Sequence, residues 1–420
     1  MGYPREVRMK HVIIGTGPAG VVAAETLRKR LPEADITLLG GEPELPYSRM
    51  AIPYHLIGKV DEGGTHLRPT AGHFDALRIE LRQHIVESIH PDSKALTLVG
   101  GDTLTFDKLL LATGSRATRP PIPGMDLPGV VNCWTLADAR KIIAGANAGD
   151  DVVLMGAGFI GCIILEALAL RGVKLTVVEM ENRMVPRMMD EKSGGLLKQW
   201  CEAKGVRVLT STRVQSVSED AGKLVVELSG HEPLKVNLVI SATGVQANTD
   251  LANGLLDTNY GIIVNERLQT SHPDIFAAGD VAEGKDFSTG SYSVQAIQPT
   301  AVEHGYLAAI NMSGGKNALH RGSINMNVLD TMGLISASFG LWQGVDGGDA
   351  ATLDNTARYR YINLQFEGDV LVGANTLGMT QHIGVMRGLI QNRTRLGKWK
   401  HKLMDDPTRV MEAYLAHHVP

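Results

Sequence analysis

The sequence predicts an α/β protein in which two similar strand–turn–helix units precede a smaller α+β region. The first observation is an internal repeat: residues 12–20 read VIIGTGPAG and residues 153–161 read VLMGAGFIG. Each copy is a short apolar strand followed by G-x-G-x-x-G and a helix-forming run. The second observation is that a further strand follows each helix at the expected distance. One such fingerprint could be a chance glycine turn, but the ordered pair indicates two Rossmann-like dinucleotide-binding domains.

The individual elements follow from local patterns. In the first unit we expect a helix over 19–30, closed by Pro32, and a strand over 36–39. Beyond Gly384 the chain reads as helical and basic. The other expected strands are 175–178, 206–209, 224–228, 238–242 and 359–366.

The domain boundaries are predicted from breaker residues. Three prolines in residues 119–124 cannot continue a helix or a central strand, so this segment reads as a linker. We predict a discontinuous first domain over 1–118 and 245–320. The second domain is then 119–244, and the C-terminal domain is 321–420.

Composition indicates an ordinary globular chain. Apolar residues make up 44% and charged residues 20% of 420 residues, and the net charge is −4. This balance gives no general attraction to nucleic acid. The most apolar stretch, 152–165, is too short to cross a bilayer, and the N-terminus carries no apolar signal segment. With three scattered cysteines, at 133, 162 and 201, we expect a cytoplasmic protein without membrane insertion.

Glycines are required in the two turns because a pyrophosphate must approach the backbone and rest on a helix N-terminus. There, unpaired N–H groups and the helix dipole favour an anion. The predicted contacts are Gly15, Gly17, Pro18, Ala19 and Gly20 in the first turn, and Gly156, Gly158, Phe159, Ile160 and Gly161 in the second.

Acidic residues after the second strands indicate the nucleotide. Glu179 ends the second strand of the later unit, where a carboxylate accepts ribose hydroxyls and repels a 2′-phosphate, so NAD(H) is favoured over NADP(H). Arg183 and Arg187 follow, and they could hold the pyrophosphate or accept a 2′-phosphate instead. In the first unit the nearest acid, Glu42, is displaced by two residues. Glu42 either reaches the ribose from the turn or is a solvated surface residue.

Further motifs complete an ordered set. One apolar strand ends in Ala112-Thr113-Gly114, a second copy ends in Ala242-Thr243-Gly244, and residues 272–280 read HPDIFAAGD. Over residues 10–315 the set resembles the FAD-dependent pyridine nucleotide-disulfide oxidoreductase superfamily. The branch it resembles holds ferredoxin and rubredoxin reductases, the flavin portion of NADH-nitrite reductase, and NADH oxidases. This resemblance implies FAD in the first unit, NADH in the second, and a C-terminal interface domain.

The resemblance also implies roles for single residues. The first glycine turn would hold the FAD pyrophosphate. The resemblance also makes Ala112, Thr113 and Gly114, and Gly244 in the second copy of that motif, cofactor-binding residues. Arg49 would face the cofactor, and the Val86 backbone would contact the adenine.

Asp280 and a following helix would act on the flavin. Asp280 would accept a hydrogen bond from the ribityl chain of FAD. The residue type supports this independently, because a carboxylate just past a buried strand requires hydrogen-bond donors. The alternative is that Asp280 caps a helix. Gln298, Pro299 and Thr300 begin a helix whose positive end would stabilise the anion formed on flavin reduction. The alternative is an ordinary helix start.

The sequence departs from the family pattern at the redox centre. Disulfide-reducing members carry a cysteine pair and some others a single cysteine, but here the matching position is Met50, which cannot form a thiolate. The three cysteines read as buried structural residues. A Lys–Glu pair of many relatives is replaced by Tyr54 and Ile163. The sequence therefore nominates no catalytic side chain, and no metal motif is found.

Direct transfer follows from these departures: NADH would pass hydride to flavin, and flavin would exchange single electrons with an iron-sulfur protein or subunit, in either direction. The alternatives are an FAD/NAD subunit of a larger complex, an NADH oxidase using O2, and a non-enzymatic NADH-sensing flavoprotein. Residues 387–404 contain six basic side chains and no acidic one. This segment could steer an acidic partner to the protein, or it could be an ordinary solvated helix surface. A homodimer is also open.

Overall fold

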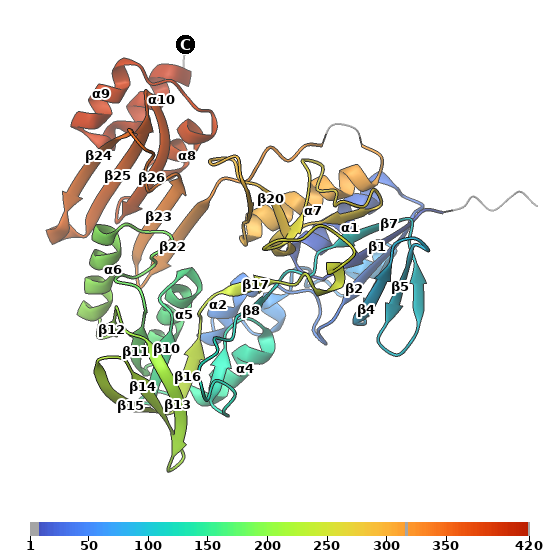
Figure 1. Ribbon diagram of the computed structural model, residues 1–420, viewed down its shortest axis with the longest axis horizontal. Coiled ribbons are helices and arrows are strands. Elements are labelled where there is room, and N and C mark those ends of the chain that lie inside the picture. Colours follow the sequence, from blue (N-terminus) through green and yellow to red (C-terminus); the bar gives the residue numbers. More distant parts are fainter. Residues whose placement is uncertain (1–7, 316–317, 419–420) are drawn as a thin grey trace, which may run out of the picture.

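The computed structural model describes residues 8–315 and 318–418, and it contains three five-stranded sheets (Figure 1). The first two sheets are parallel and the third is antiparallel. This arrangement confirms the predicted α/β class with a smaller α+β C-terminal part.

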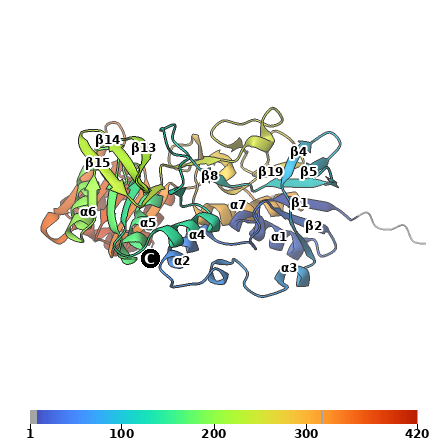
Figure 2. The ribbon, with the colours of Figure 1, turned by 90° about the horizontal axis from the view of Figure 1, so that it is seen from below.

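The first parallel sheet has the strand order β19-β7-β1-β2-β3. Its strands are β1 (Lys10–Ile14), β2 (Asp35–Gly40), β3 (Ile79–Gln83), β7 (Lys108–Leu111) and β19 (Ile275–Ala277). Its helices are α1 (Pro18–Arg30), α2 (Ile52–Leu56), α3 (His73–Ala76) and α7 (Gln298–Met312). Figure 2 shows helix α1 on one face and a small antiparallel sheet on the other. That sheet comprises β4 (Val86–His90), β5 (Ala95–Leu98) and β6 (Thr103–Thr105).

The second parallel sheet has the order β12-β11-β10-β16-β9 and repeats the design of the first. Its strands are β9 (Val130–Asn132), β10 (Asp151–Met155), β11 (Lys174–Val178), β12 (Arg207–Leu209) and β16 (Leu238–Ser241). Its helices are α4 (Leu136–Gly145), α5 (Phe159–Leu170) and α6 (Glu191–Ala203), and an antiparallel sheet is formed by β13 (Val214–Asp220), β14 (Lys223–Leu228) and β15 (His231–Val236). The strands predicted from the sequence are confirmed here, with ends shifted by one residue where they differ.

Two short strands mark where the chain passes between the parallel sheets. Strand β8 (Ser115–Ala117) pairs with β17 (Val245–Ala247), so the outgoing and returning chain run side by side. The predicted boundaries at 118 and 245 fall at these crossings, and the extents of the domains stay a prediction. A further small sheet comprises β18 (Ile262–Ile263), β20 (Ala282–Lys285) and β21 (Tyr292–Val294).

The C-terminal part is an antiparallel sheet of order β22-β23-β26-β25-β24. Its strands are β22 (Met326–Thr331), β23 (Leu334–Gly340), β24 (Asp349–Asn355), β25 (Arg360–Glu367) and β26 (Val370–Leu377), and its helices are α8 (Ile383–Gln391), α9 (Lys398–Asp405) and α10 (Val410–His418). Leu329, Leu334 and Leu377 belong to the same buried cluster as the helices of the second parallel sheet. The C-terminal sheet therefore shares a hydrophobic core with that unit.

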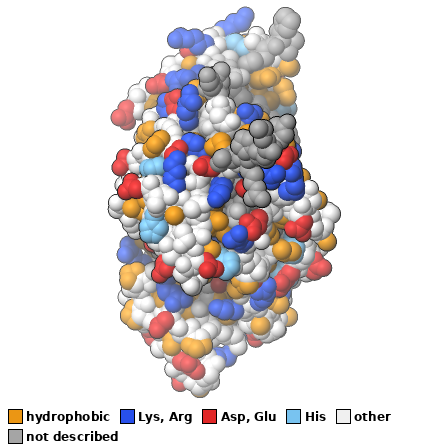
Figure 3. Space-filling model, turned by 90° about the vertical axis from the view of Figure 1, so that its right-hand side faces the viewer, with side chains coloured by type: hydrophobic (Ala, Val, Ile, Leu, Met, Phe, Trp, Pro, Cys, Tyr) orange, Lys and Arg blue, Asp and Glu red, His pale blue; other side chains and the backbone are white. Residues whose placement is uncertain are grey.

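Charged side chains are mixed on the molecular surface. On the face seen in Figure 3, Lys and Arg side chains lie among Asp and Glu side chains without a broad area of one sign. None of the helices in the described ranges is both long and apolar enough to span a bilayer.

One buried histidine in the first sheet leads to a prediction about pH and stability. His11 on β1 is fully buried, and neither ring nitrogen has a partner. Burial lowers its pKa from 6.5 to about 4. As pH falls below 6.5 the unfolded chain takes up a proton that the folded chain does not, so stability falls until about pH 4.

We therefore expect His11→Leu to reduce the loss of unfolding free energy between pH 7 and 4.5 by about 2–3 kcal/mol. Urea unfolding at both pH values measures this difference. His401→Leu, at an exposed position, serves as the control. An unchanged loss in the His11 variant would show that His11 does not titrate in this window.

Candidate functional site

A cavity of about 430 Å³ lies where the two parallel units and helix α7 meet. It gathers residues from distant parts of the chain, including the first glycine turn, the end of β7 and the start of α5. The predicted site residues that line it are Gly15, Gly17, Pro18, Ala19, Glu42, Arg49, Val86, Ala112, Thr113, Gly114, Phe159, Ile160, Asp280 and Gln298. The lining does not include Gly20, Gly156, Gly158, Gly161, Glu179, Arg183, Arg187, Gly244, Pro299 or Thr300.

The three glycines of the first turn are needed for different reasons. Gly15 has φ +117°, and a Cβ there would lie 1.9 Å from the Ala112 carbonyl oxygen. A Cβ on Gly20 would lie 1.9 Å from the Gly15 carbonyl oxygen, so this glycine allows α1 to pack on the turn. A Cβ on Gly17 would meet no atom within 4 Å. The space beside Gly17 is open, although Gly17 is the N-cap of α1 and carries no side-chain cap.

The second turn repeats this geometry. A Cβ on Gly156 would lie 2.6 Å from the Ala242 carbonyl oxygen, and one on Gly161 would lie 2.1 Å from the Gly156 carbonyl oxygen. A Cβ on Gly158 would again meet nothing within 4 Å. Both middle glycines therefore keep open space at an uncapped helix N-terminus, where backbone N–H groups can meet an anion.

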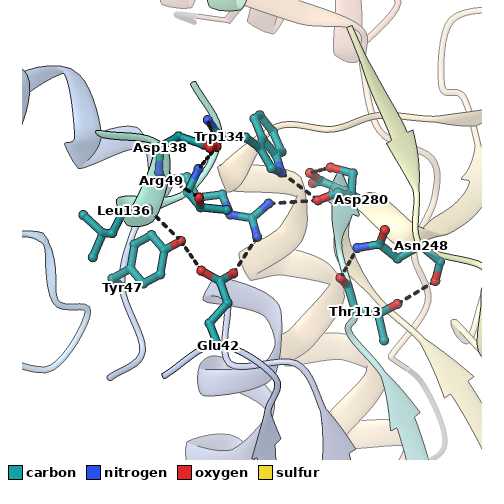
Figure 4. Close-up of polar contacts among 11 residues, drawn as sticks. Glu42, Tyr47, Arg49, Thr113, Trp134, Leu136, Asp138, Asn248 and Asp280 are labelled. Atoms are coloured by element: carbon teal, nitrogen blue, oxygen red, sulfur yellow. Dashed lines mark hydrogen bonds and ion pairs between the residues drawn. The ribbon is translucent and has the colours of Figure 1, made fainter. Parts of the chain in front are cut away.

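Arg49 is at the centre of a polar cluster on the cavity wall (Figure 4). Its Nη2 donates to Glu42 Oε1 at 3.0 Å, and its Nη1 donates to the Ser115 carbonyl at 2.9 Å. The Tyr47 hydroxyl donates to Glu42 Oε2 at 2.7 Å. The guanidinium lies 4.9 Å from the Trp134 ring, and Trp134 Nε1 donates to the same Ser115 carbonyl. Glu42 is thus a paired cavity residue rather than a solvated surface residue.

Asp280 lies near this cluster on the other side of Ser115. It follows β19 in a short 3-10 helix, and Ser115 Oγ donates to its Oδ2 at 2.8 Å. Burial raises the pKa of Asp280, while the Ser115 bond and the nearby Arg49 oppose that rise. A half-buried carboxylate with one protein donor retains acceptor capacity toward the cavity.

The end of β7 is fixed by Asn248. Asn248 Nδ2 donates to the Thr113 carbonyl at 2.8 Å, and Thr113 Oγ1 donates to the Asn248 carbonyl at 2.9 Å. Gly114 adopts φ +68°, a conformation that glycine takes without strain. Val86, at the start of β4, is buried on the cavity wall.

Helix α7 begins at the cavity as predicted, at Gln298 with Pro299 in its first turn. No side chain caps the N-terminus of this helix, so its first backbone N–H groups have no side-chain acceptor at the cap position. Ser48 Oγ donates to Gln298 Oε1 at 2.7 Å, while Thr300 is buried in the helix.

The residues after the second strand of the later unit have different surroundings. Glu179 is buried; its Oε2 accepts from Ala157 N at 2.7 Å and its Oε1 from Glu181 N at 2.9 Å. Arg183 donates to the carbonyls of Met189 and Pro186 at 2.8 and 3.1 Å, so its guanidinium holds its own loop. Arg187 is exposed. Gly244 adopts φ +116° and accepts from Thr118 N beside the crossing strands.

Comparison with known proteins decides the family. The profile of the pyridine nucleotide-disulphide oxidoreductases matches residues 9–305. The chain belongs to this family. Its members use FAD and NAD(H), so both cofactors expected from the sequence are those of the family. The protein is an oxidoreductase that works with flavin and NAD(H).

Several individual relatives match this chain over most of its length. The epsilon subunit of NADH-dependent phenylglyoxylate dehydrogenase from Aromatoleum evansii is 29% identical over 96% of each chain. The ferredoxin–NAD(+) reductase component of a 3-phenylpropionate/cinnamic acid dioxygenase from Photorhabdus laumondii is 28% identical over 91% of this chain and 96% of that protein. An NADH oxidase from Methanocaldococcus jannaschii is 33% identical over 73% of this chain and 70% of that protein.

A solved structure also matches the family member. The NAD-dependent persulfide reductase from A. fulgidus superposes with a TM-score of 0.86 at 28% identity. The match covers 93% of this chain and 78% of that chain. It extends past the region matched by the family profile.

Three residues that support the site of this oxidoreductase were missed by sequence reasoning. Tyr47 and Trp134 line the cavity, where Tyr47 donates to Glu42 and Trp134 lies against Arg49. Ser115 is not in the lining, but it bonds both Arg49 and Asp280. Tyr47 precedes Arg49 by two residues, and Ser115 follows the Ala112–Gly114 motif, so proximity to these motifs could have suggested both. Trp134 follows the linker, and no pattern in the sequence connects it with the cavity.

Three of the six basic side chains in residues 387–404 have an acidic partner within the protein. Arg393 pairs with Glu367 at 3.2 Å, Arg395 lies 3.9 Å from Asp369, and Lys400 pairs with Asp349. Because these acids come from other parts of the C-terminal sheet, they are not visible in the local sequence. This pairing favours the solvated-helix interpretation over a patch that steers an acidic partner.

Proposed function

We propose that this protein passes electrons between NAD(H) and an iron-sulfur protein or subunit without a redox-active cysteine. Bound FAD would supply the chemistry, because flavin exchanges a hydride with NADH and single electrons with a one-electron partner. The observation that carries the proposal is the state of the thiols at the cavity. Cys133 lines the cavity, but it is buried and burial raises its pKa to about 12. A thiol in that state is a poor nucleophile.

The remaining thiols support the same conclusion. Burial raises the pKa of Cys162 well above its ordinary value and that of Cys201 to about 12. Neither lines the cavity, whereas Met50, at the family's cysteine position, and Ile163 both do. The cavity wall formed by η1 (Arg49–Ala51) and the start of α5 therefore offers no ionisable thiol among these residues.

The residues around the cavity offer the hydrogen-bonding groups that FAD requires. The open space beside Gly17 and the uncapped start of α1 suit a pyrophosphate, and we assign Gly15, Gly17, Pro18, Ala19 and Gly20 to it. Asp280 is placed to accept from a hydroxyl group. Arg49 and Glu42 line the same wall, with Val86 and Ala112–Gly114 further along it. Helix α7 has an uncapped start at Gln298, Pro299 and Thr300, and its positive end would favour negative charge on the flavin ring.

NAD(H) is assigned to the second turn. The open side of Gly158 matches that of Gly17, and we assign Gly156, Gly158, Phe159, Ile160, Gly161 and Gly244 to the nucleotide. Glu179 supports NADH over NADPH, because a carboxylate disfavours a 2′-phosphate and its oxygens retain lone pairs beyond the two backbone bonds. Arg183 is committed to its own loop, which leaves Arg187 as the nearby exposed cation.

Whole-length relatives support a partner protein. One is the epsilon subunit of a larger dehydrogenase and another is the ferredoxin reductase component of a dioxygenase, and both span this chain including its C-terminal sheet. The NADH oxidase matches a smaller share of the chain, so we propose O2 reduction as the second candidate function.

An anoxic titration tests the proposal. Purified, flavin-loaded protein should be reduced by NADH and then reoxidised by ferredoxin faster than by O2. A native pull-down should recover an iron-sulfur chain. Rapid aerobic NADH consumption with no acceleration by ferredoxin would establish the oxidase alternative instead.

A thiol-free variant gives a separate prediction. Replacing all three cysteines by alanine should leave NADH-to-ferredoxin turnover within about twofold of wild type, because no cysteine carries electrons. Stability should fall moderately, since each small buried side chain loses packing. Steady-state turnover and thermal unfolding measure the two effects separately. A loss of turnover in Cys133→Ala alone, with flavin retained, would contradict the proposed mechanism.

A further inference from the structure

The loop that follows β11 connects the second glycine turn to the C-terminal sheet. Residues 179–190 carry Glu179 and Arg183, and they run along the turn before α6 begins. The two segments are joined through Ala157: its N–H donates to Glu179 Oε2 at 2.7 Å, and its carbonyl accepts from Val185 N at 2.8 Å. The loop therefore sets the position of the turn to which we assign NAD(H).

The loop has a strained point at this junction. Val185 adopts φ +45°, and a β-branched residue is disfavoured in that left-handed region. It is buried against the core of the second unit. Such a conformation persists only where surrounding contacts enforce it.

The C-terminal sheet holds the other end of the loop by hydrogen bonds. Asn375 of β26 donates from Nδ2 to the Met188 carbonyl at 2.7 Å, and its Oδ1 accepts from Ser193 Oγ at 2.8 Å. Tyr361 of β25 donates its hydroxyl proton to Asp190 Oδ2 at 2.6 Å. Asp190 in turn caps α6 by accepting from Ser193 N. Figure 1 shows α6 directly beside the C-terminal sheet.

These contacts are buried, so they fix the loop firmly. Asn375 and Ser193 are fully buried and Tyr361 is 5% exposed. Removing one partner leaves a buried polar group unmet, which costs more than the bond contributes. Met332, in the β22–β23 turn, adds contacts with the same unit: its N–H donates to Glu166 and its carbonyl accepts from Trp200.

We infer that Asn375 and Tyr361 are positioning residues for NAD(H): from the C-terminal sheet they hold the 179–190 loop, and through it the second glycine turn, in the binding geometry. This inference rests on the proposed assignment of NAD(H) to that turn. It gives the C-terminal sheet a part in nucleotide binding although neither residue lines the cavity.

The test separates nucleotide affinity from flavin binding and stability. For Tyr361→Phe we expect NAD+ and NADH to bind about fivefold more weakly, and for Asn375→Ala about tenfold, by isothermal titration of the flavin-loaded protein. Flavin content should be unchanged, the KM for NADH should rise, and kcat should be retained. Amides of residues 183–190 should exchange faster by mass spectrometry.

Matched variants exclude a general loss of stability. Tyr359→Phe changes a tyrosine that packs on Trp200 instead of the loop, and Thr376→Ala truncates the next residue of β26, which points to the opposite sheet face. Both should keep wild-type affinity. Variant affinities within twofold of wild type, or equal losses in the controls, would overturn the inference. If wild-type protein itself bound neither NAD+ nor NADH, the proposed function would fail instead.

Discussion

We expect Gly17→Val to lose FAD while the apoprotein remains folded. Gly17 has φ −73°, which valine adopts readily, and a Cβ at this position meets no protein atom within 4 Å. The side chain would instead occupy the open space beside the α1 N-terminus that we assign to the pyrophosphate. Affinity for FAD should fall by about two orders of magnitude, which corresponds to about 3 kcal/mol. Flavin fluorescence titration of the apoprotein measures this change, and circular dichroism checks the fold.

Two other glycine variants make this expectation specific. Gly158→Val should keep flavin but prevent its reduction by NADH, because the same open space is filled at the second turn. Gly20→Val should be destabilised with or without flavin, since its Cβ would lie 1.9 Å from the Gly15 carbonyl oxygen. If Gly17→Val bound FAD normally, the first turn would not be the pyrophosphate site.

The paired turns explain why so much of the fold could be predicted. Strand–glycine–helix units are local in sequence, and the second-strand positions follow from the length of the intervening helix. The sequence therefore placed both ends of α1, β2 and β11, and the start of α7, within one residue of where they are observed. The shared core between the C-terminal sheet and the second unit could not be predicted, because Leu329 and Leu377 carry no signal of which surface they cover.

Residues of the candidate site could be predicted only where a single local motif determines their geometry. Backbone geometry at Gly15 and Gly156 follows from residue type and spacing. Two partners of Arg49, Ser115 and Trp134, lie 66 and 85 residues further along the chain. Their contacts with Arg49 could therefore be found only from the three-dimensional structure. Glu179 is a mixed case: its place at the strand end was predicted, whereas its bond to Ala157 N was not.

That bond changes the expected consequence of removing the Glu179 carboxylate. Glu179→Ala removes the proposed ribose acceptor and also leaves the N–H groups of Ala157 and Glu181 without their buried partner. A hydrogen bond to a charged group contributes about 1.5–3 kcal/mol, so loss of the ribose contact should raise the KM for NADH by one to two orders of magnitude. The two unmet donors should lower the stability of the folded protein. The proposed preference for NADH over NADPH should shrink at the same time, because the charge opposing a 2′-phosphate is gone.

Glu181→Ala provides the matched control for this prediction. Glu181 is exposed, and its backbone N–H, which donates to Glu179, is retained in the variant. Its KM for NADH should therefore stay within about twofold of wild type, since a solvated carboxylate contributes little to binding at a distance. Flavin content should be unaffected in both variants, because the first glycine turn is untouched. Stopped-flow reduction by NADH and by NADPH measures both effects. A Glu179→Ala protein with wild-type KM values would show that the nucleotide ribose is held elsewhere and that the second turn keeps its geometry without the carboxylate.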